Sequence, residues 1–233
     1  MMLSSEHIQL LNLFETKSLF TVQRYFRIQN YLRKKRKELI IICQHPPVIT
    51  AGIQINPDHL LSSIKTLSKE RVEYFSTKRA GGFTAHEFGQ CVIYPNIDLT
   101  KRAIPISKYF HSLLLITQTI MKQIWNIDTI TLPNQPGLYL NKKISKKYPT
   151  FYSKIVSAGI DCRSNFATYG FSININNSMD TFKHIIPCGQ KDVLPVSIAS
   201  LLGHNVEVDT FYTEWVNKFE EFLYGYLKYP SGL

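Results

Sequence analysis

The chain has 233 residues, of which 44% are apolar and 12% aromatic, a composition that excludes a disordered protein and allows a sizeable core. Lys and Arg outnumber Asp and Glu by 27 to 17, which gives a formal net charge of +10 and favours acidic partners. The basic residues are scattered and form no stripe interleaved with aromatics, so no nucleic-acid partner is expected. We expect residues 1–233 to form one domain.

Apolar runs and cysteines indicate the compartment. The longest apolar runs, such as Leu39–Cys43, are too short to span a bilayer, which takes about 20 residues. No secretory signal opens the chain. Cys43, Cys91, Cys162 and Cys188 are widely spaced, with no CxxC pair and no cluster of metal ligands. The sequence therefore predicts free thiols, no membrane association and a cytoplasmic location.

The first half of the chain predicts a helix followed by strands. Apolar residues recur at near-helical spacing over Lys17–Lys37, where a solvated RKKRK run ends the predicted helix. A β-branched run at Glu38–His45, closed by two prolines, predicts a buried strand. Two further strands are predicted at Val72–Lys78 and Gln90–Leu99, and the glycine-rich segment between them predicts a functional loop.

The second half predicts a long helix, then strands, then two shorter helices. The helix over Ser107–Trp125 carries an apolar face, with Ser107 as its predicted N-cap. The other predicted elements are strands at Gly137–Lys143, Ser153–Cys162 and Phe166–Asn176, and helices at Ser197–Leu202 and Thr210–Leu227. Because the strands cluster between helices without regular βαβ alternation, we expect an α/β (α+β) fold, a mixed sheet flanked by helices.

One cysteine stands apart from the others. Cys188 lies between a proline and a glycine in FKHIIPCGQKD, with basic residues on both sides. Cys43, Cys91 and Cys162 instead lie in or beside apolar strand patterns and are expected to be core or strand thiols. From the residues alone, Cys188 is a candidate nucleophile, and a buried structural thiol is the commoner alternative.

Several blocks of the sequence carry a family resemblance when they are taken together. RAGGFTAHEFGQCVIYPNIDL (Arg79–Leu99) resembles the signature RGGxxTxHGPGQ-x-V-x-YP. SKIVSAGI (Ser153–Ile160) and YGFSININNSMDTFKHIIPCG (Tyr169–Gly189) resemble the KIxSIG and HGxALNVxxDLxxFxxIxPCG blocks, in the same order. HPPVITAG (His45–Gly52) and VSIASL (Val196–Leu201) resemble the HxPVxTxG and TSL segments. Through these blocks the chain resembles the octanoyltransferases of lipoate biosynthesis.

This resemblance implies a catalytic domain like that of biotin protein ligases and lipoate ligases, without a cofactor or a metal. It implies transfer of an octanoyl group from octanoyl-acyl carrier protein to a lysine of lipoyl domains, in 2-oxoacid dehydrogenase E2 subunits and in the glycine cleavage H protein. Cys188 matches the cysteine that holds the acyl thioester, and Lys154 matches the lysine that lowers the pKa of that thiol. A free thiol with a pKa of about 8.5 is only a few per cent thiolate at neutral pH, so a nearby ammonium would activate it.

The resemblance also implies three substrate-binding stretches. They are Arg79, Ala80, Gly81, Gly82, Phe83, Thr84, Ala85 and His86, then Ser157, Ala158 and Gly159, and then Gly170, Phe171 and Ser172. An apolar tunnel would stabilise the acyl chain by roughly 0.8 kcal/mol per buried methylene. Two alternatives remain open: His86 could be a structural histidine, and the glycines could serve only as turn formers.

The sequence departs from the family pattern at several positions. Ala80 replaces a glycine, Glu87-Phe88 replaces Gly-Pro, and Tyr169 replaces a histidine. An alanine at a position with positive φ would strain the loop. The basic connection at Asn141–Ser153 is longer than the family's usual turn, and would either contact an acidic carrier or be a solvated insertion.

Two competing functions share the expected fold. An ATP-dependent lipoate or biotin ligase would need an adenylate-binding lysine motif in place of the cysteine, so Cys188 argues against it. A non-catalytic homologue that only binds the carrier is the second alternative.

Overall fold

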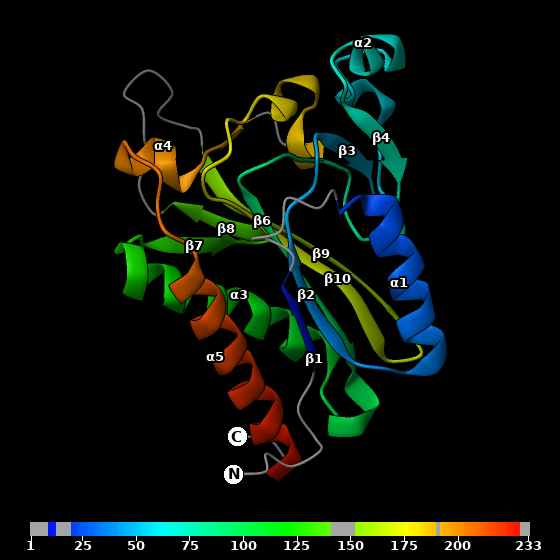
Figure 1. The fold of residues 1–233 in the computed structure, drawn as a ribbon, viewed down its shortest axis with the longest axis vertical. Coiled ribbons are helices and arrows are strands. Elements are labelled where there is room, and N and C mark those ends of the chain that lie inside the picture. The colour runs from blue at the N-terminus through cyan, green and yellow to red at the C-terminus, as the bar shows by residue number, and fades with distance from the viewer. Residues whose placement is uncertain (1–8, 13–19, 141–151, 190–191, 229–233) are drawn as a thin grey trace.

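The computed structural model describes residues 9–12, 20–140, 152–189 and 192–228, and contains two β-sheets and five α-helices within them (Figure 1). The larger sheet has eight strands in the order β1-β2-β6-β10-β9-β8-β7, with β11 paired to β9. Most neighbours are antiparallel, and β1–β2 and β9–β11 are parallel. Its strands are β1 (Gln9–Asn12), β2 (Leu39–Cys43), β6 (Gln90–Asp98), β7 (Thr129–Leu132), β8 (Gln135–Leu140), β9 (Tyr152–Arg163), β10 (Phe166–Asn174) and β11 (Val193–Pro195).

A small sheet and the helices complete the described fold. The small sheet has the order β4-β3-β5, formed by β3 (Val48–Ala51), β4 (Glu73–Ser76) and β5 (Phe83–His86). The α-helices are α1 (Val22–Lys35), α2 (Ile64–Lys69), α3 (Ile106–Trp125), α4 (Ile198–Leu202) and α5 (Asp209–Lys228). Short 3-10 turns are η1 (Pro57–His59), η2 (Leu99–Arg102), η3 (Thr181–His184) and η4 (Pro187–Gly189).

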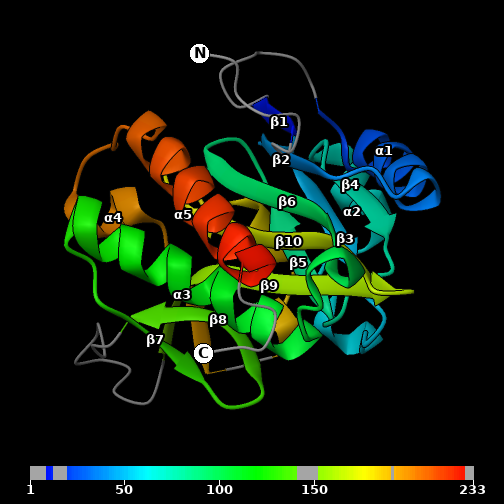
Figure 2. The same cartoon turned by 90° about the horizontal axis from the view of Figure 1, so that it is seen from below.

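The large sheet separates two layers. Helices α3 and α5 pack on one face, and α1 and the small sheet lie on the other side (Figures 1 and 2). Strand β2 contributes side chains to both layers. Ile40 and Ile42 belong to the main core cluster with α3 and α5, whereas Ile41 and Cys43 pack with residues of α1. This alternation is the period of two expected for a strand buried on both faces.

The mixed sheet flanked by helices confirms the predicted fold class. The first helix begins at Val22, where Thr21 caps it by accepting a hydrogen bond from the Arg24 N–H. Residues 20–21 are therefore not helical as predicted, and 17–19 lie outside the described residues. The RKKRK run is only partly solvated, since Arg36 ends the helix in a left-handed conformation and binds the carboxylate of Asp98.

Two further predictions are corrected. Ser107 is not the N-cap of α3, because the helix begins one residue earlier, at Ile106, after Pro105. The predicted loop between the strands ending at Lys78 and starting at Gln90 contains β5, which pairs antiparallel with β3. Its segment has no strong strand pattern of its own, and pairing with β3 gives it extended structure. No helix among the described residues is long and apolar enough to cross a membrane.

Candidate active site

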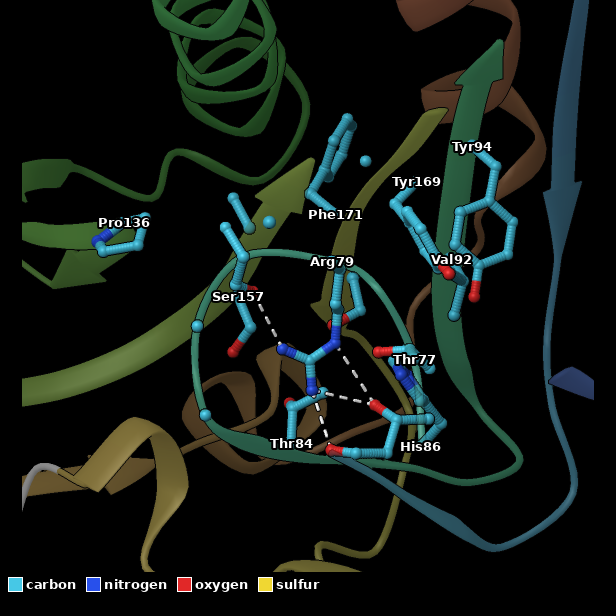
Figure 3. Close-up of a pocket in the computed structure, with 18 of the residues that line it drawn as sticks. Thr77, Arg79, Thr84, His86, Val92, Tyr94, Pro136, Ser157, Tyr169 and Phe171 are labelled. Atoms are coloured by element: carbon cyan, nitrogen blue, oxygen red, sulfur yellow. Dashed lines mark hydrogen bonds between the residues drawn. The ribbon is translucent and has the colours of Figure 1, made fainter. Parts of the chain in front are cut away.

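A cavity of about 180 Å³ lies between the two sheets. The predicted substrate-binding residues line it with the exception of Phe83 and Ala85, so three stretches distant in sequence converge on one pocket. Figure 3 shows Pro136 and Ser157 at one side of this pocket and Val92, Tyr94 and Tyr169 at the other. The full lining is Val22, Thr50, Gln54, Thr77, Arg79, Ala80, Gly81, Gly82, Thr84, His86, Val92, Tyr94, Asn134, Pro136, Ser157, Ala158, Gly159, Tyr169, Gly170, Phe171 and Ser172.

Strand β5 divides its residues between the pocket and the core. Thr84 and His86 line the pocket. Phe83 and Ala85, one residue out of phase, are buried in a second apolar cluster under the small sheet. Since successive strand residues point to opposite faces, these two contribute packing and not a pocket wall.

Arg79 anchors the loop that covers the pocket. Its Nη2 donates to the carbonyl and hydroxyl of Thr50, at 2.8 and 2.9 Å, and its Nη1 donates to the Ala80 carbonyl at 3.1 Å. These hydrogen bonds tie the loop to β3 (Figure 3). The predicted substrate contact of Arg79 is thus accompanied by a structural role that its sequence context did not reveal.

The alanine in this loop causes no backbone strain. Ala80 is absent from the described residues with positive φ, whereas Gly81 has a φ of 89°. The condition for strain is therefore not met at Ala80, because the left-handed conformation falls on the next residue. Gly159 beneath it does need to be glycine, since an added Cβ would lie 2.8 Å from the Ala80 carbonyl oxygen.

A buried hydroxyl in the pocket lacks a partner. Thr84 lies directly opposite Thr50 in the β3–β5 register. The Thr50 hydroxyl accepts from Arg79, but the buried Thr84 Oγ1 makes no hydrogen bond within the described residues. A buried polar atom without a protein partner costs free energy, so this hydroxyl is suited to meet a polar atom of a bound ligand.

His86 is a neutral imidazole with one defined tautomer. The Gln90 amide nitrogen donates to the Ala85 carbonyl and to Asn174 Oδ1, so the Gln90 oxygen faces His86 Nδ1 at 2.7 Å and accepts a hydrogen bond from its N–H. Burial and the nearby His45 lower the pKa of His86 from 6.5 to about 3. His86 thus makes the hydrogen bond expected of a structural histidine. Its ring also lines the pocket, as expected of a substrate-binding residue.

A second buried histidine holds the apolar side of the pocket. His45 Nδ1 lies 2.5 Å from the Phe20 carbonyl and donates to it, so Nε2 accepts from the Tyr94 hydroxyl at 2.8 Å. Burial lowers the pKa of His45 to about 4, which keeps it neutral. Tyr169, in place of the family's histidine, accepts from the Lys78 N–H at 3.3 Å. Both phenol groups point their polar ends into the protein and leave ring surface for the pocket.

A β-bulge sets the direction of Lys154. Gly137 pairs with Ser157 and Tyr139 with Lys154, so β9 holds one residue more than β8 over this stretch. Consecutive Ile155 and Val156 both join the main core cluster. The bulge therefore places Lys154 on the same face as the pocket residue Ser157, although a regular strand would put residues three apart on opposite faces.

Lys154 is 2% exposed and does not line the pocket, but it lies beside it. A Cβ added to Gly137 would be 2.7 Å from Lys154 Cε, so the lysine stem occupies the space that this glycine leaves. Pro136, the residue before Gly137, lines the pocket. The Lys154 ammonium lies over the Tyr139 ring, with Nζ 5.1 Å from its centroid.

The backbone of Cys188 lies in η4, which is in contact with β5. The Cys188 side chain lies outside the part of the chain that the structure describes. Burial raises the pKa of the thiols of Cys43, Cys91 and Cys162, whose side chains are described, and makes them poor nucleophiles. The basic connection at 141–151 is also outside the described residues.

Glu87 supports the approach to Cys188. Its carboxylate accepts hydrogen bonds from the backbone N–H groups of Met179 and Thr181, at 2.6 and 2.8 Å, and from Asn177 Nδ2 at 3.1 Å. This carboxylate thus holds the turn before η3 and η4. Of the two residues that replace the family's Gly-Pro, Glu87 therefore has a structural role, and Phe88 is exposed.

Sequence reasoning missed part of the lining. Thr50, Val92 and Tyr94 lie in segments already noted for their resemblance, and their place in the lining could have been suspected. Val22 carries no such signal, because an apolar residue that faces a pocket has the same pattern as one that faces the core.

The chain is similar in sequence to proteins of one family. Residues 20–220 match the family described as lipoyl protein ligase A/B catalytic domain. An octanoyltransferase of Leptospira borgpetersenii is 40% identical over 72% of this chain and 73% of its own. An octanoyltransferase of Leptospira interrogans is 37% identical over 76% of this chain and 79% of its own.

Two solved structures share the fold at low identity. A lipoate-protein ligase A bound with ATP has a TM-score of 0.66 and 15% identity, covering 94% of this chain and 86% of its own. A putative lipoate protein ligase from T. acidophilum with bound lipoic acid has a TM-score of 0.64 and 14% identity, with the same coverage.

Proposed function

Since the chain belongs to the octanoyltransferase family, we propose that it transfers an octanoyl group from octanoyl-acyl carrier protein to a lysine of lipoyl domains. The acceptors would be the lipoyl domains of 2-oxoacid dehydrogenase E2 subunits and the glycine cleavage H protein. The whole chain would act as one catalytic domain in the cytoplasm. The observation that carries the proposal is the convergence of residues 79–82, 84, 86, 157–159 and 170–172 on one pocket, with η4 beside β5.

The proposed first half-reaction is a thioester exchange. The Cys188 thiolate attacks the octanoyl carbonyl, the bond to the carrier sulfur breaks, and the carrier leaves as a thiolate that takes up a proton. The two thioesters have similar energies, so alignment and stabilisation of the oxyanion are the main demands. The unpaired Thr84 hydroxyl supports a role as a donor to the acyl oxygen.

The proposed second half-reaction is aminolysis. The acceptor lysine loses a proton and attacks the acyl carbonyl, and Cys188 leaves as a thiolate. Lys154, left neutral after the Cys188 thiolate is consumed and its proton has passed to the carrier thiol, would take the proton from the incoming amine. The ammonium formed in this way would hold the departing Cys188 thiolate charged. The burial of Lys154 on the pocket face of β9 supports both roles.

The pocket also suits the acyl chain. Val22, Val92 and the rings of Tyr94 and Tyr169 give it an apolar side. Burying the octanoyl tail at roughly 0.8 kcal/mol per methylene would contribute several kcal/mol. Exclusion of water from the same space would protect the acyl-enzyme from hydrolysis.

Mass spectrometry of the full chain tests this function. Incubation with octanoyl-acyl carrier protein and no ATP should add one octanoyl group, located on Cys188 after proteolysis, and adding a lipoyl domain should remove it. Cys188→Ser should gain no stable adduct and lose transfer. An ATP requirement would favour a ligase, and binding of the carrier without an adduct would favour a non-catalytic homologue.

Lys154 variants separate the two half-reactions. Lys154→Arg keeps a positive charge but cannot accept a proton, so the Cys188 adduct should still form while its transfer to the lipoyl domain falls by about 100-fold. Lys154→Met should impair both steps, because it removes the charge. Equal loss of both steps in the arginine variant, with its thermal stability unchanged, would contradict the proton-accepting role.

A further inference from the structure

One segment links the pocket loop to the approach to Cys188. The N–H of Ile53 donates to the Arg79 carbonyl and that of Gln54 to the Gly81 carbonyl, both at 3.1 Å. Further along, the His59 carbonyl accepts from the Ile186 N–H at 2.8 Å, two residues before Cys188. The segment 52–64 is therefore held against the pocket loop at one end and against the approach to η4 at the other.

The same segment exposes large apolar side chains. Ile53 is 66% exposed and Ile55 is 45% exposed, and they flank Gln54, which lines the pocket. Leu61 and Ile64 are also more than half exposed. Single exposed apolar residues are ordinary, but two that flank a residue of the pocket, with two more further along the same segment, are typical of a protein-binding surface.

The proposed function indicates which partner meets this surface. An acyl carrier presents its thioester at the end of a long flexible arm, so its body can stay away from the pocket. A lipoyl domain must reach the acyl group with a lysine side chain of only four methylenes. The body of the acceptor therefore has to touch the rim of the pocket.

We propose that Ile53 and Ile55 form the docking contact for the lipoyl domain, an inference that rests on the proposed function. Charge agrees with an acidic acceptor: the chain carries a formal charge of +10. Exposed Lys65 and Lys69 follow the apolar group on α2, and exposed Lys78 precedes the pocket loop. The apolar pair would supply the contact, and the surrounding charge would increase the rate of encounter.

Separate assays of the half-reactions test this assignment. Ile53→Asp and Ile55→Asp should lower kcat/KM for transfer to a lipoyl domain by about tenfold or more, mainly through KM. Acylation of Cys188 by octanoyl-acyl carrier protein should stay within about twofold of the unsubstituted protein. Leu115→Asp is the matched control, because Leu115 is 49% exposed on α3, on the opposite side of the large sheet, and should change neither step.

Ile53→Ser and Ile55→Ser control for misfolding of the aspartate variants, because they remove the apolar contact without adding a charge. Slower acylation by the carrier with normal transfer to the lipoyl domain would assign the surface to the donor and overturn the proposal. Unchanged kinetics in all four variants would overturn it as well. Failure of the proposed function is a different result, because the unsubstituted protein would then form no Cys188 adduct.

Discussion

At the residue scale, Thr84 offers the sharpest test of the pocket. Its hydroxyl is buried and unpaired within the described residues, while the facing Thr50 hydroxyl is used by Arg79. If Thr84 donates to the acyl oxygen, Thr84→Val should lower kcat for Cys188 acylation by about 100-fold or more, in line with the loss of one oxyanion donor. Stopped-flow acylation kinetics would measure this.

Stability distinguishes this role from a structural one. Replacing an unpaired buried hydroxyl by a methyl group of similar shape should leave the free energy of unfolding unchanged or slightly raised. Thr84→Ser keeps the hydroxyl and should retain most of the rate. A valine variant that acylates at the original rate would show that the hydroxyl has no part in the reaction.

The sequence predicted which residues line the pocket better than it predicted what each of them does there. The motif resemblance placed Arg79 and Thr84 in one stretch, and both line the pocket. The resemblance could not reveal that Arg79 hydrogen-bonds to Thr50, because Thr50 lies in a strand about thirty positions earlier in the chain. Nor could it tell that Phe83 faces the core, since that depends on the phase of β5.

At the element scale, the β8–β9 bulge is the feature that directs Lys154. Gly137 has a φ of 138°, and an added Cβ would lie 2.2 Å from the Val156 carbonyl oxygen and 2.7 Å from Lys154 Cε. Gly137→Ala should therefore lower the free energy of unfolding by about 2–4 kcal/mol and displace the lysine. Chemical denaturation and the Cys188 adduct assay would measure the two effects.

Gly203→Ala is the matched control for that substitution. Gly203 also has a positive φ, 80°, but an added Cβ would meet nothing within 4 Å. It should cost only about 1 kcal/mol of backbone strain and leave acylation unchanged. Equal effects of the two substitutions would mean that the packing of Gly137 against Lys154 does not matter.

Elements were predictable where local pattern and final structure agree. The predicted helices near α3 and α5 and the strands near β2, β6, β9 and β10 have long apolar patterns, and the structure contains each of them. Strands β3, β5, β7 and β11 are only three or four residues long and were not predicted as strands. Their extended form comes from pairing with neighbours, which a local pattern does not contain.

At the scale of the whole molecule, the two neutral histidines make folding depend on pH. His45 and His86 have pKa values of about 4 and about 3 in the folded protein, because burial disfavours their charged form. In the unfolded chain both return to about 6.5. Between these values the unfolded state binds more protons than the folded state, so the free energy of unfolding falls as pH decreases from about 6.5.

Denaturant unfolding between pH 7.5 and 4.5 would measure this dependence. The free energy of unfolding should be constant above pH 7 and fall by about 2–3 kcal/mol per histidine by pH 4.5.

His45→Gln keeps an amide that can donate to Phe20 and accept from Tyr94 but cannot titrate, so the slope of its free energy of unfolding with pH should be shallower. His111→Gln, at an exposed site on α3, should keep the full slope. The Asp98 carboxylate has little part in the effect: burial would raise its pKa, but hydrogen bonds from Arg36 and Thr100 outweigh burial and hold the pKa below 3.8, under this window. A His45→Gln slope equal to that of the unsubstituted protein would show that this imidazole is not the group that titrates.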